Sequence, residues 1–319
     1  MRFAFTDDQL AFRDAVRELL DRECPPAVVR AAWTNPRGRA VAAWSRLAEM
    51  GVLAALAPEA TGGLGLSLVD LVLVLEETGY AALPDPVVEH AAVAVPLLAA
   101  SPADAIGSGT ITAAWEPDRR VVSADTADLL AIGDGARWRV VPASDVALEP
   151  RTSVDGARRL FAFEPHAVDG PAVVDEQAFD RGVLGFAAQL LGLTRRMLDL
   201  TVGYVTERRQ FGVPVGSFQA VQHRLADARL ALEFARPLVY RAAWSLAVGD
   251  PDAPVHASMA KLQASTAALQ TGRAALQCHG AIGYSYEYDL HLFLKRAWAL
   301  AATWGDAGWH RARVRRAIL

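Results

Sequence analysis

Apolar positions recur at a helical spacing through most of the first hundred residues. Thr6 followed by Gln9 fits a capping box, and the apolar side chains after it fall on one face, which predicts a helix over residues 7–22. The same kind of pattern predicts further helices over residues 44–50, 67–79 and 89–100. Residues 1–102 are therefore predicted to form an all-helical domain.

The pattern changes in the middle of the chain and changes back near residue 176. Short runs of β-branched and aromatic residues, separated by Gly, Asp and Pro, predict a small β-domain over residues 103–175. These runs are residues 110–112, 121–122, 137–141 and 160–163. The helical period then returns over residues 179–206, 218–248, 255–280 and 289–302. Residues 176–319 are predicted to form an antiparallel four-helix bundle, so the predicted fold class is mainly α.

Composition and charge narrow the class of protein. A hydrophobic share of 52% with 21% charged residues describes a folded chain with an ample core. The 32 Lys and Arg against 36 Asp and Glu leave a net charge of −4, which argues against a general binder of nucleic acid. The longest apolar stretch, residues 91–100, is about half of the roughly 20 residues that a membrane span needs.

The chain start and the cysteines add two further expectations. The first residues lack the apolar core of a secretory signal, so we expect a cytoplasmic protein. Cys24 and Cys278 lie far apart with no CxxC pair, so neither a disulfide framework nor a metal site is expected.

Three local strings occur in order along the chain. The first is the glycine-rich loop Pro58–Gly65, followed by a helix that ends near Glu76-Glu77. The second is ERRQFGVPVGSFQAVQH, residues 207–223, and the third is QCHGAIGYSYE, residues 277–287. Together with the order of helices, sheet and long-helix bundle, these strings resemble the acyl-CoA dehydrogenase family of flavoproteins. The second string is long and specific, and the resemblance covers nearly the whole chain.

The resemblance implies which residues contact the cofactor FAD. In the family, the arginine that matches Arg208 binds the FAD pyrophosphate, for which a planar guanidinium offers two parallel hydrogen bonds. The aromatic residue that matches Phe211 packs by the adenosine half. Gln277 and Gly280 match positions that reach the flavin cofactor of the neighbouring subunit. Ala281 stands where the family usually has glycine, so we expect altered packing there.

Without the resemblance to the family, several of these residues would be interpreted as purely structural. Arg208 and Arg209 alone fit a solvated surface pair, and Gly280 fits the end of a helix. Glu76 and Glu77 are expected to form an exposed acidic turn rather than a catalytic pair. The glycine-rich loop lacks the lysine of a phosphate-binding loop and does not by itself predict phosphate binding.

The residue that would carry the family reaction is absent from its usual place. Acyl-CoA dehydrogenases take a proton from the carbon next to a thioester and pass a hydride to flavin, which needs a carboxylate base near the substrate. Counting forward from Gln277 at the family spacing reaches Trp304, which cannot take a proton. A second family location for the base falls near Gly182, where no carboxylate stands, although Asp180 is close. The resemblance therefore predicts no catalytic residue in this chain.

The middle domain also lacks residues that line the flavin ring in typical members. Their Thr-Glu-Pro string continues into Gly-Ser-Asp, whereas residues 112–118 here have no such continuation, and Trp138 is either a remnant or a core aromatic. This asymmetry resembles the branch of the family in actinobacterial steroid degradation, where two different chains form an α2β2 heterotetramer with two flavins. We expect this chain to complete the FAD site of a homologous partner, which holds most of a bulky acyl-CoA substrate such as a steroid-derived one.

Two alternatives remain open at this point. One is a homomeric flavoenzyme with a displaced base, for which Asp180, Glu287 and Asp306 are the candidates. The other is a non-catalytic helical scaffold, in which residues 208–223 serve only folding and assembly.

Overall fold

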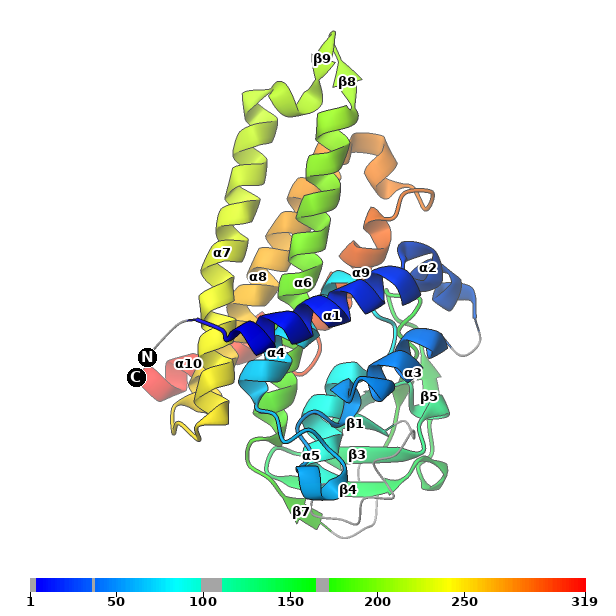
Figure 1. Ribbon diagram of the computed structural model, residues 1–319, viewed down its shortest axis with the longest axis vertical. Helices are drawn as coiled ribbons and strands as arrows, with labels where there is room; N and C mark the ends of the chain where they lie inside the picture. The colour runs from blue at the N-terminus through cyan, green and yellow to red at the C-terminus, as the bar shows by residue number, and fades with distance from the viewer. Residues whose placement is uncertain (1–3, 36–37, 99–110, 165–171) are drawn as a thin grey trace.

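The longest elements of the computed structural model are three helices that lie side by side. The structure describes residues 4–35, 38–98, 111–164 and 172–319. The three helices are α6 (Ala178–Glu207), α7 (Gln219–Ala247) and α8 (Ala253–His279), and they run along the long axis of the molecule (Figure 1). The hairpin of β8 (Arg209–Gln210) and β9 (Val213–Pro214) lies beyond their upper end in this view. The predicted long helices are confirmed.

Two shorter helices complete the C-terminal part. The helix α9 (Leu290–Ala301) packs against α6 and α8, and α10 (Ala307–Ile318) packs against α8. The sequence predicted α9 as the fourth helix of the bundle but did not predict α10. No helix in the described part of the chain is both long and apolar enough to cross a membrane.

Short helices of the N-terminal part lie against one side of the bundle, in front of it in Figure 1. They are α1 (Asp7–Glu23), α2 (Pro26–Thr34), α3 (Val41–Glu49), α4 (Leu68–Tyr80), the π-helix η3 (Val88–Ala94) and α5 (Val95–Leu98). The predicted capping box of Thr6 and Gln9 starts α1, and Ser67 with Asp70 forms a second box that starts α4. The helix α2 was not predicted, because Pro26 ends one helical pattern and also starts a helix, where no backbone N–H donor is needed.

Some sequence predictions fall on residues outside the described part. The predicted helix 89–100 is matched by η3 and α5 as far as Leu98, and positions 99 and 100 lie outside the description. The same holds for the predicted domain boundary between residues 102 and 103 and for position 110 of the first predicted strand run.

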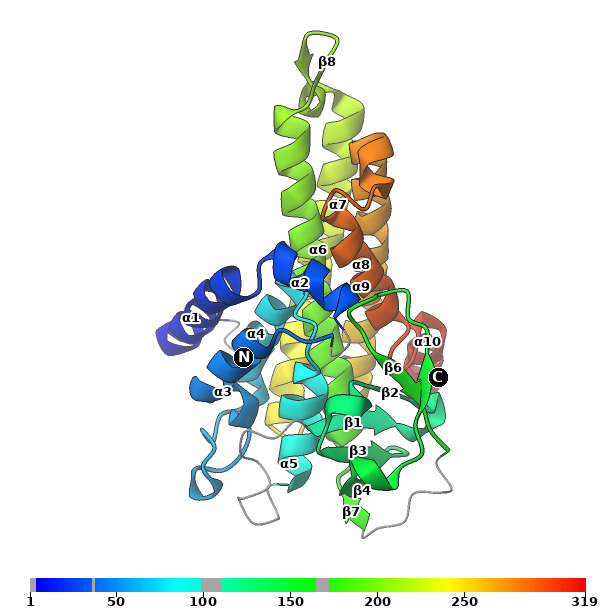
Figure 2. The same ribbon diagram turned by 90° about the vertical axis from the view of Figure 1, so that its right-hand side faces the viewer.

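The middle of the chain forms two small sheets that pack against the lower half of the bundle (Figure 2). One sheet has the order β1-β3-β4-β7 and the other β2-β6-β5, and every pairing except β1 with β3 is antiparallel. Their bounds are β1 (Ile111–Trp115), β2 (Arg120–Val122), β3 (Leu129–Gly133), β4 (Arg137–Pro142), β5 (Glu149–Arg151), β6 (Leu160–Ala162) and β7 (Ala172–Val174). The sequence did not predict β3, β5 or β7. β5 and β7 have only three residues each, and all three strands are extended where they pair with a neighbour.

One hydrophobic core joins the three parts. It contains Leu71 of α4, Ile111 of β1 and Phe186 of α6, all at most 1% exposed. A smaller cluster around Leu130 and Phe161 lies within the sheets. The mainly α fold with a small sheet region is confirmed, and the exact domain boundaries stay predictions.

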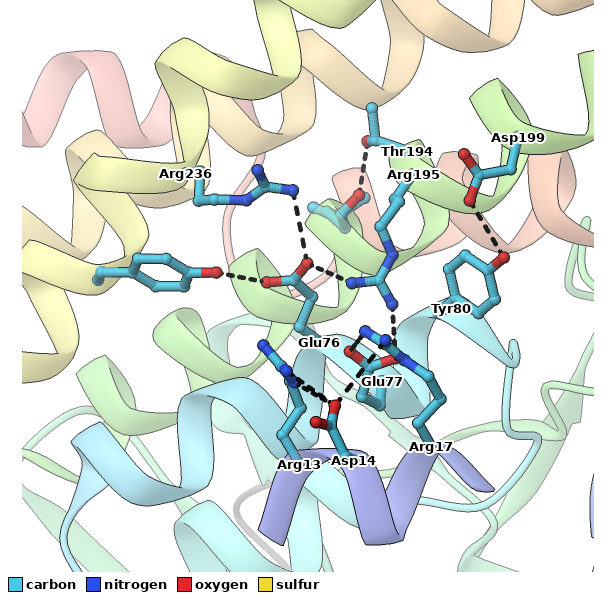
Figure 3. A network of polar contacts seen from close by, with 12 residues as sticks. Arg13, Asp14, Arg17, Glu76, Glu77, Tyr80, Thr194, Arg195, Asp199 and Arg236 are labelled. Carbon is cyan, nitrogen blue, oxygen red and sulfur yellow. Dashed lines mark hydrogen bonds and ion pairs between the residues drawn. The ribbon is translucent and has the colours of Figure 1, made fainter. Parts of the chain in front are cut away.

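The acidic pair at the end of α4 was predicted to be an exposed turn, and this prediction is wrong. Glu76 and Glu77 are only 3% and 2% exposed. Arg17 of α1 donates two hydrogen bonds to Glu77, at 2.8 and 3.0 Å, and Arg195 of α6 bonds both carboxylates, at 2.5 and 3.0 Å (Figure 3). Tyr240 of α7 donates to Glu76 at 2.9 Å. The two carboxylates therefore connect four helices.

The charge state of this junction follows from its contacts. Burial acts to raise the pKa of Glu77, but the hydrogen bonds from Arg17 and Arg195 outweigh it, and the pKa lies below its ordinary value. Burial and the nearby Glu76 raise the pKa of the Tyr240 phenol. Glu77 therefore stays ionised at neutral pH and serves as a structural anion rather than a proton acceptor.

Candidate cofactor-binding site

An open cavity of about 370 Å³ lies at the upper end of the bundle, where α6 and α8 end. Three of the five predicted cofactor residues, Arg208, Gln277 and Gly280, line it. Arg224 of α7 lines it too and adds a second guanidinium, which the sequence analysis did not single out. The structure thus brings two distant strings of the sequence to one surface cavity.

Local backbone geometry explains how Arg208 and Gly280 reach this cavity. The helix α6 ends at Glu207, and Arg208 is extended, with φ −65° and ψ 121°, before the chain enters the hairpin. Gly280 has φ +65°, a left-handed conformation that favours glycine, and it ends α8 as predicted. Arg208, which follows α6, and Gly280, which follows α8, therefore both reach the upper cavity.

The neighbouring residues Arg208 and Arg209 differ in their contacts. The Arg209 guanidinium donates to the carbonyl oxygen of Gly212 at 3.0 Å, within the hairpin. The Arg208 side chain is exposed and has no hydrogen bond or ion pair to any other described residue. Arg208 is thus available to a ligand in the cavity, whereas Arg209 is engaged in the turn.

The other two predicted cofactor residues do not line the cavity. Phe211 lies in the turn of the hairpin with φ +53°, is 93% exposed, and its ring centroid is 6.3 Å from that of Phe218. Ala281 is exposed and follows Gly280 in the short 3-10 helix η10 (Gly280–Tyr284). Contact of Phe211 and Ala281 with a cofactor stays a prediction.

The donor set of the cavity suits the phosphate part of a dinucleotide. Arg208 and Arg224 supply guanidinium groups, which match phosphate oxygens in charge and geometry, and Gln277 supplies an amide. The volume lies in the range of small-molecule sites. The pyrophosphate of FAD therefore fits here, and because these side chains are exposed, the cofactor can belong to another chain.

Both predicted base positions meet in the interior, at the opposite end of α6. A Cβ atom on Gly182 would lie 2.1 Å from Cζ3 of Trp304, so the indole rests on the helix backbone. Trp304 is 3% exposed and stacks with Phe179 at 5.7 Å and 9° and with Trp138 at 5.9 Å and 26°. Trp138, predicted as either a remnant or a core aromatic, is fully buried and belongs to the core. Aromatic rings occupy the space where a base would stand.

The carboxylates proposed as displaced bases are engaged or distant. Asp180 is 2% exposed and ion-paired with Arg313, which donates to it at 3.0 Å, and burial raises the pKa of Asp180 while Arg313 opposes this. Asp306 is the N-cap of α10 and accepts from the backbone N–H of Trp309 at 2.8 Å. Glu287 is exposed and lies in the segment after η10.

A cavity of about 180 Å³ between the sheets and α9 adjoins Trp304, and the carboxylates at its wall are Glu89 and Asp118. Glu89 of η3 is 4% exposed and lies 3.9 Å from the Arg158 guanidinium. Asp118 accepts from Arg120 at 2.9 Å. Glu89 was not predicted as a site residue from the sequence, although a single acid in an apolar run is typical of a residue that needs a partner.

A helical N-terminal part, a small sheet region and a long-helix bundle with a cavity at its end form the domain order that the resemblance predicted. The acyl-CoA dehydrogenase N-terminal domain family matches residues 6–115, and the acyl-CoA dehydrogenase C-terminal domain family matches residues 169–319. The acyl-CoA dehydrogenase IpdE2 of Mycobacterium tuberculosis is 34% identical over 302 residues, which cover 91% of each chain. The chain therefore belongs to the acyl-CoA dehydrogenase family, whose cofactor is FAD.

Solved structures share the fold over nearly the whole chain. The ChsE4-ChsE5 complex from Mycobacterium tuberculosis has a TM-score of 0.86 at 23% identity and covers 99% of this chain and 98% of that one. A Tcur3481-Tcur3483 steroid acyl-CoA dehydrogenase variant has a TM-score of 0.85 at 25% identity, with 98% of both chains covered. PigA, solved with FAD and proline, has a TM-score of 0.85 at 18% identity and covers 100% of this chain and 99% of that one.

Proposed function

We propose that this chain is a subunit of a heteromeric, FAD-dependent acyl-CoA dehydrogenase. It completes the FAD site of a homologous partner and contributes no catalytic base. The observation that carries the proposal is a contrast within one chain: the cavity of Arg208 is open and polar, while Trp304 fills the interior.

The upper cavity supports a role in holding a cofactor that belongs to another chain. Arg208 and Arg224 would bind the pyrophosphate, and Gln277 and the backbone at Gly280 would contact the adjoining part of the cofactor. FAD supplies the hydride acceptor of the reaction. This chain's part is to add positive charge and hydrogen-bond donors, which position the cofactor from outside the partner.

The filled interior supports the absence of a base in this chain. Trp304 has no group that can accept the α-proton, and Asp180 is committed to Arg313. The reaction, α,β-desaturation of an acyl-CoA, would then take place in the partner, which would hold most of the substrate. An α2β2 assembly and a bulky, steroid-derived acyl chain agree with the names of the structures that share the fold, a two-chain complex and a steroid acyl-CoA dehydrogenase.

A comparison of two adjacent arginines tests the proposal. The chain is co-expressed with a homologous partner, and the complex is purified from wild type, Arg208→Ala and Arg209→Ala. Arg208→Ala is expected to lower the flavin content or the FAD affinity at least about tenfold, the loss expected for a charge-assisted phosphate contact. Arg209→Ala serves as the matched control, since Arg209 bonds within the hairpin. Unchanged flavin in the Arg208→Ala complex overturns the proposed role and favours the scaffold alternative.

The homomeric alternative rests on Asp306, which stands two positions after Trp304. Its carboxylate caps α10; of the other two candidates, Asp180 is buried in an ion pair and Glu287 is exposed. Turnover of the complex is therefore expected to be unchanged by Asp306→Asn. A loss of turnover in that variant, with an intact fold, supports the homomeric enzyme instead.

A further inference from the structure

We propose that the Trp304 side chain permanently fills a space in this chain's interior that a ligand would otherwise enter. Its indole fills a slot formed by Phe179, Trp138 and the backbone at Gly182, and thereby closes the chain to a ligand ring or an acyl chain. The proposal deepens the proposed function and rests on it for the identity of the excluded ligands. The filling of the slot itself stands on the geometry of this chain.

The slot has the form of a site for a flat aromatic molecule. The Trp304 ring is nearly parallel to Phe179, at 9°, and is tilted by only 26° from Trp138. Phe186 meets it edge-on, with centroids 5.7 Å apart and an angle of 60°. Rings stacked against a planar group, with another ring at the edge, are the contacts by which aromatic ligands are held. Here the Trp304 side chain makes all of these contacts in place of a ligand.

The floor of the slot requires glycine. A Cβ atom at position 182 would lie 2.1 and 2.5 Å from Cζ3 and Cε3 of the indole, far inside van der Waals contact. Glycine weakens a helix interior, and Gly182 lies in the first turns of the 30-residue helix α6. The close approach of the indole gives the physical reason for a glycine at this position.

The backbone of Trp304 is held in place by buried donors. Trp304 has φ +54°, which is costly for a residue with a large side chain. Lys261, fully buried, donates to the carbonyl oxygens of Ala301 at 3.2 Å and Gly305 at 3.3 Å. Nε2–H of His310 donates to the carbonyl oxygen of Trp304 at 3.0 Å. Donors on both sides of Trp304 fix this strained loop, so the indole acts as a fixed filling and not as a gate.

The slot borders a space that already exists. Trp304 also lines the cavity of about 180 Å³ between the sheets and α9. Loss of the indole would open the slot, whose walls are the rings of Phe179, Trp138 and Phe186, next to a cavity whose wall carries Glu89, Asp118 and Arg158. Apolar cavities such as the slot take up small aromatic molecules. The geometry thus assigns a ligand class to the opened slot, namely a planar aromatic of the size of indole.

Calorimetric titration with indole tests the assignment. The full chain, in complex with its partner, is measured as wild type, Trp304→Ala and Trp298→Ala. Trp298 is the matched control, because it lines the same cavity but is 40% exposed. Trp304→Ala is expected to gain one saturable indole site that wild type and Trp298→Ala lack. No added site in Trp304→Ala, or the same site in wild type, overturns the proposal.

A second measurement uses Gly182 and does not depend on a folded Trp304→Ala. Gly182→Ala is expected to lower the melting temperature of the wild-type chain by about 4–8 °C, from the cost of overpacking. In a Trp304→Phe background the shorter side chain leaves room, and the same substitution is expected to cost less than half as much. An equal loss in both backgrounds overturns the claim that the indole needs Gly182. These readouts concern only the interior, so they can fail while the Arg208 experiment succeeds, and the reverse.

Discussion

The upper cavity and the lower interior of this chain use their chemistry-bearing residues in opposite ways. At the upper end, Arg208 is exposed and lines an open cavity. In the interior, Trp304 is stacked against Phe179 and Trp138, and Glu77 is bonded by Arg17 and Arg195. Under the proposed function, this chain offers a binding surface to another chain at its upper end, while its interior is packed with side chains. Substitutions in the two regions should then differ in what they damage.

The largest effect on stability is expected from Trp304→Ala. Removing a buried indole costs transfer free energy and leaves a cavity, together about 3–5 kcal/mol of unfolding free energy. Trp298→Ala removes the same side chain from a position that is 40% exposed, and we expect about 1 kcal/mol or less. Denaturant unfolding of both variants measures the difference. Equal losses would show that the interior is not closed around Trp304.

The next largest loss of stability is expected at the ionic junction formed by Glu76, Glu77 and their arginine partners. Arg195→Ala leaves Glu76 and Glu77 buried with fewer partners, and breaking a buried pair in this way costs about 3 kcal/mol. Arg229→Ala removes an exposed partner of Glu233 and is expected to cost about 0.5 kcal/mol or less. The same denaturant experiment compares the two arginines. A loss for Arg195→Ala as small as that for Arg229→Ala contradicts the role assigned to the junction.

Acid should weaken the interior at His310. Burial and the nearby Lys261 lower the pKa of His310 to about 3, whereas the unfolded chain takes up this proton near pH 6.5. The unfolded state therefore binds more protons below pH 6.5, and this one residue makes stability fall by up to about 1.4 kcal/mol per pH unit as the pH drops toward 3. His310→Gln should reduce the slope of unfolding free energy between pH 6.5 and 5. An unchanged slope contradicts a neutral, buried His310.

The smallest effect on stability is expected at the upper cavity. Arg208→Ala removes an exposed side chain without a partner among the described residues, so the unfolding free energy should change by about 0.5 kcal/mol or less. The flavin content of the complex should fall nonetheless. Denaturant unfolding and flavin absorbance, measured on the same preparation, separate the two effects. A large loss of stability would place Arg208 with the structural residues.

Local signals in the sequence were enough to predict much of the helical architecture. The capping box at Thr6 and the return of the helical period after residue 176 mark helices that the structure contains. The strands were harder, because β5 has the sequence EPR, fully exposed, and carries no pattern of its own. Its extended form comes from pairing with β6, which is tertiary information.

Contacts between distant residues could not be read from spacing. The helix α4 is apolar on nearly all sides, which is a sign of a buried helix and of partners for its glutamates, yet Arg17 and Arg195 lie 60 and 118 positions from Glu77. Likewise, counting along the chain reached Trp304 and Gly182 separately. Their contact follows from the packing of α6 against the loop after α9, and only the fold brings them together.

The flavin content of the purified complex tests the central claim most directly. The complex of this chain with a homologous partner is denatured, and released flavin is compared with the amounts of both chains. The account predicts one flavin for each pair of unlike chains and none in this chain purified alone. One flavin for every chain, or a flavin held by this chain alone, would contradict it.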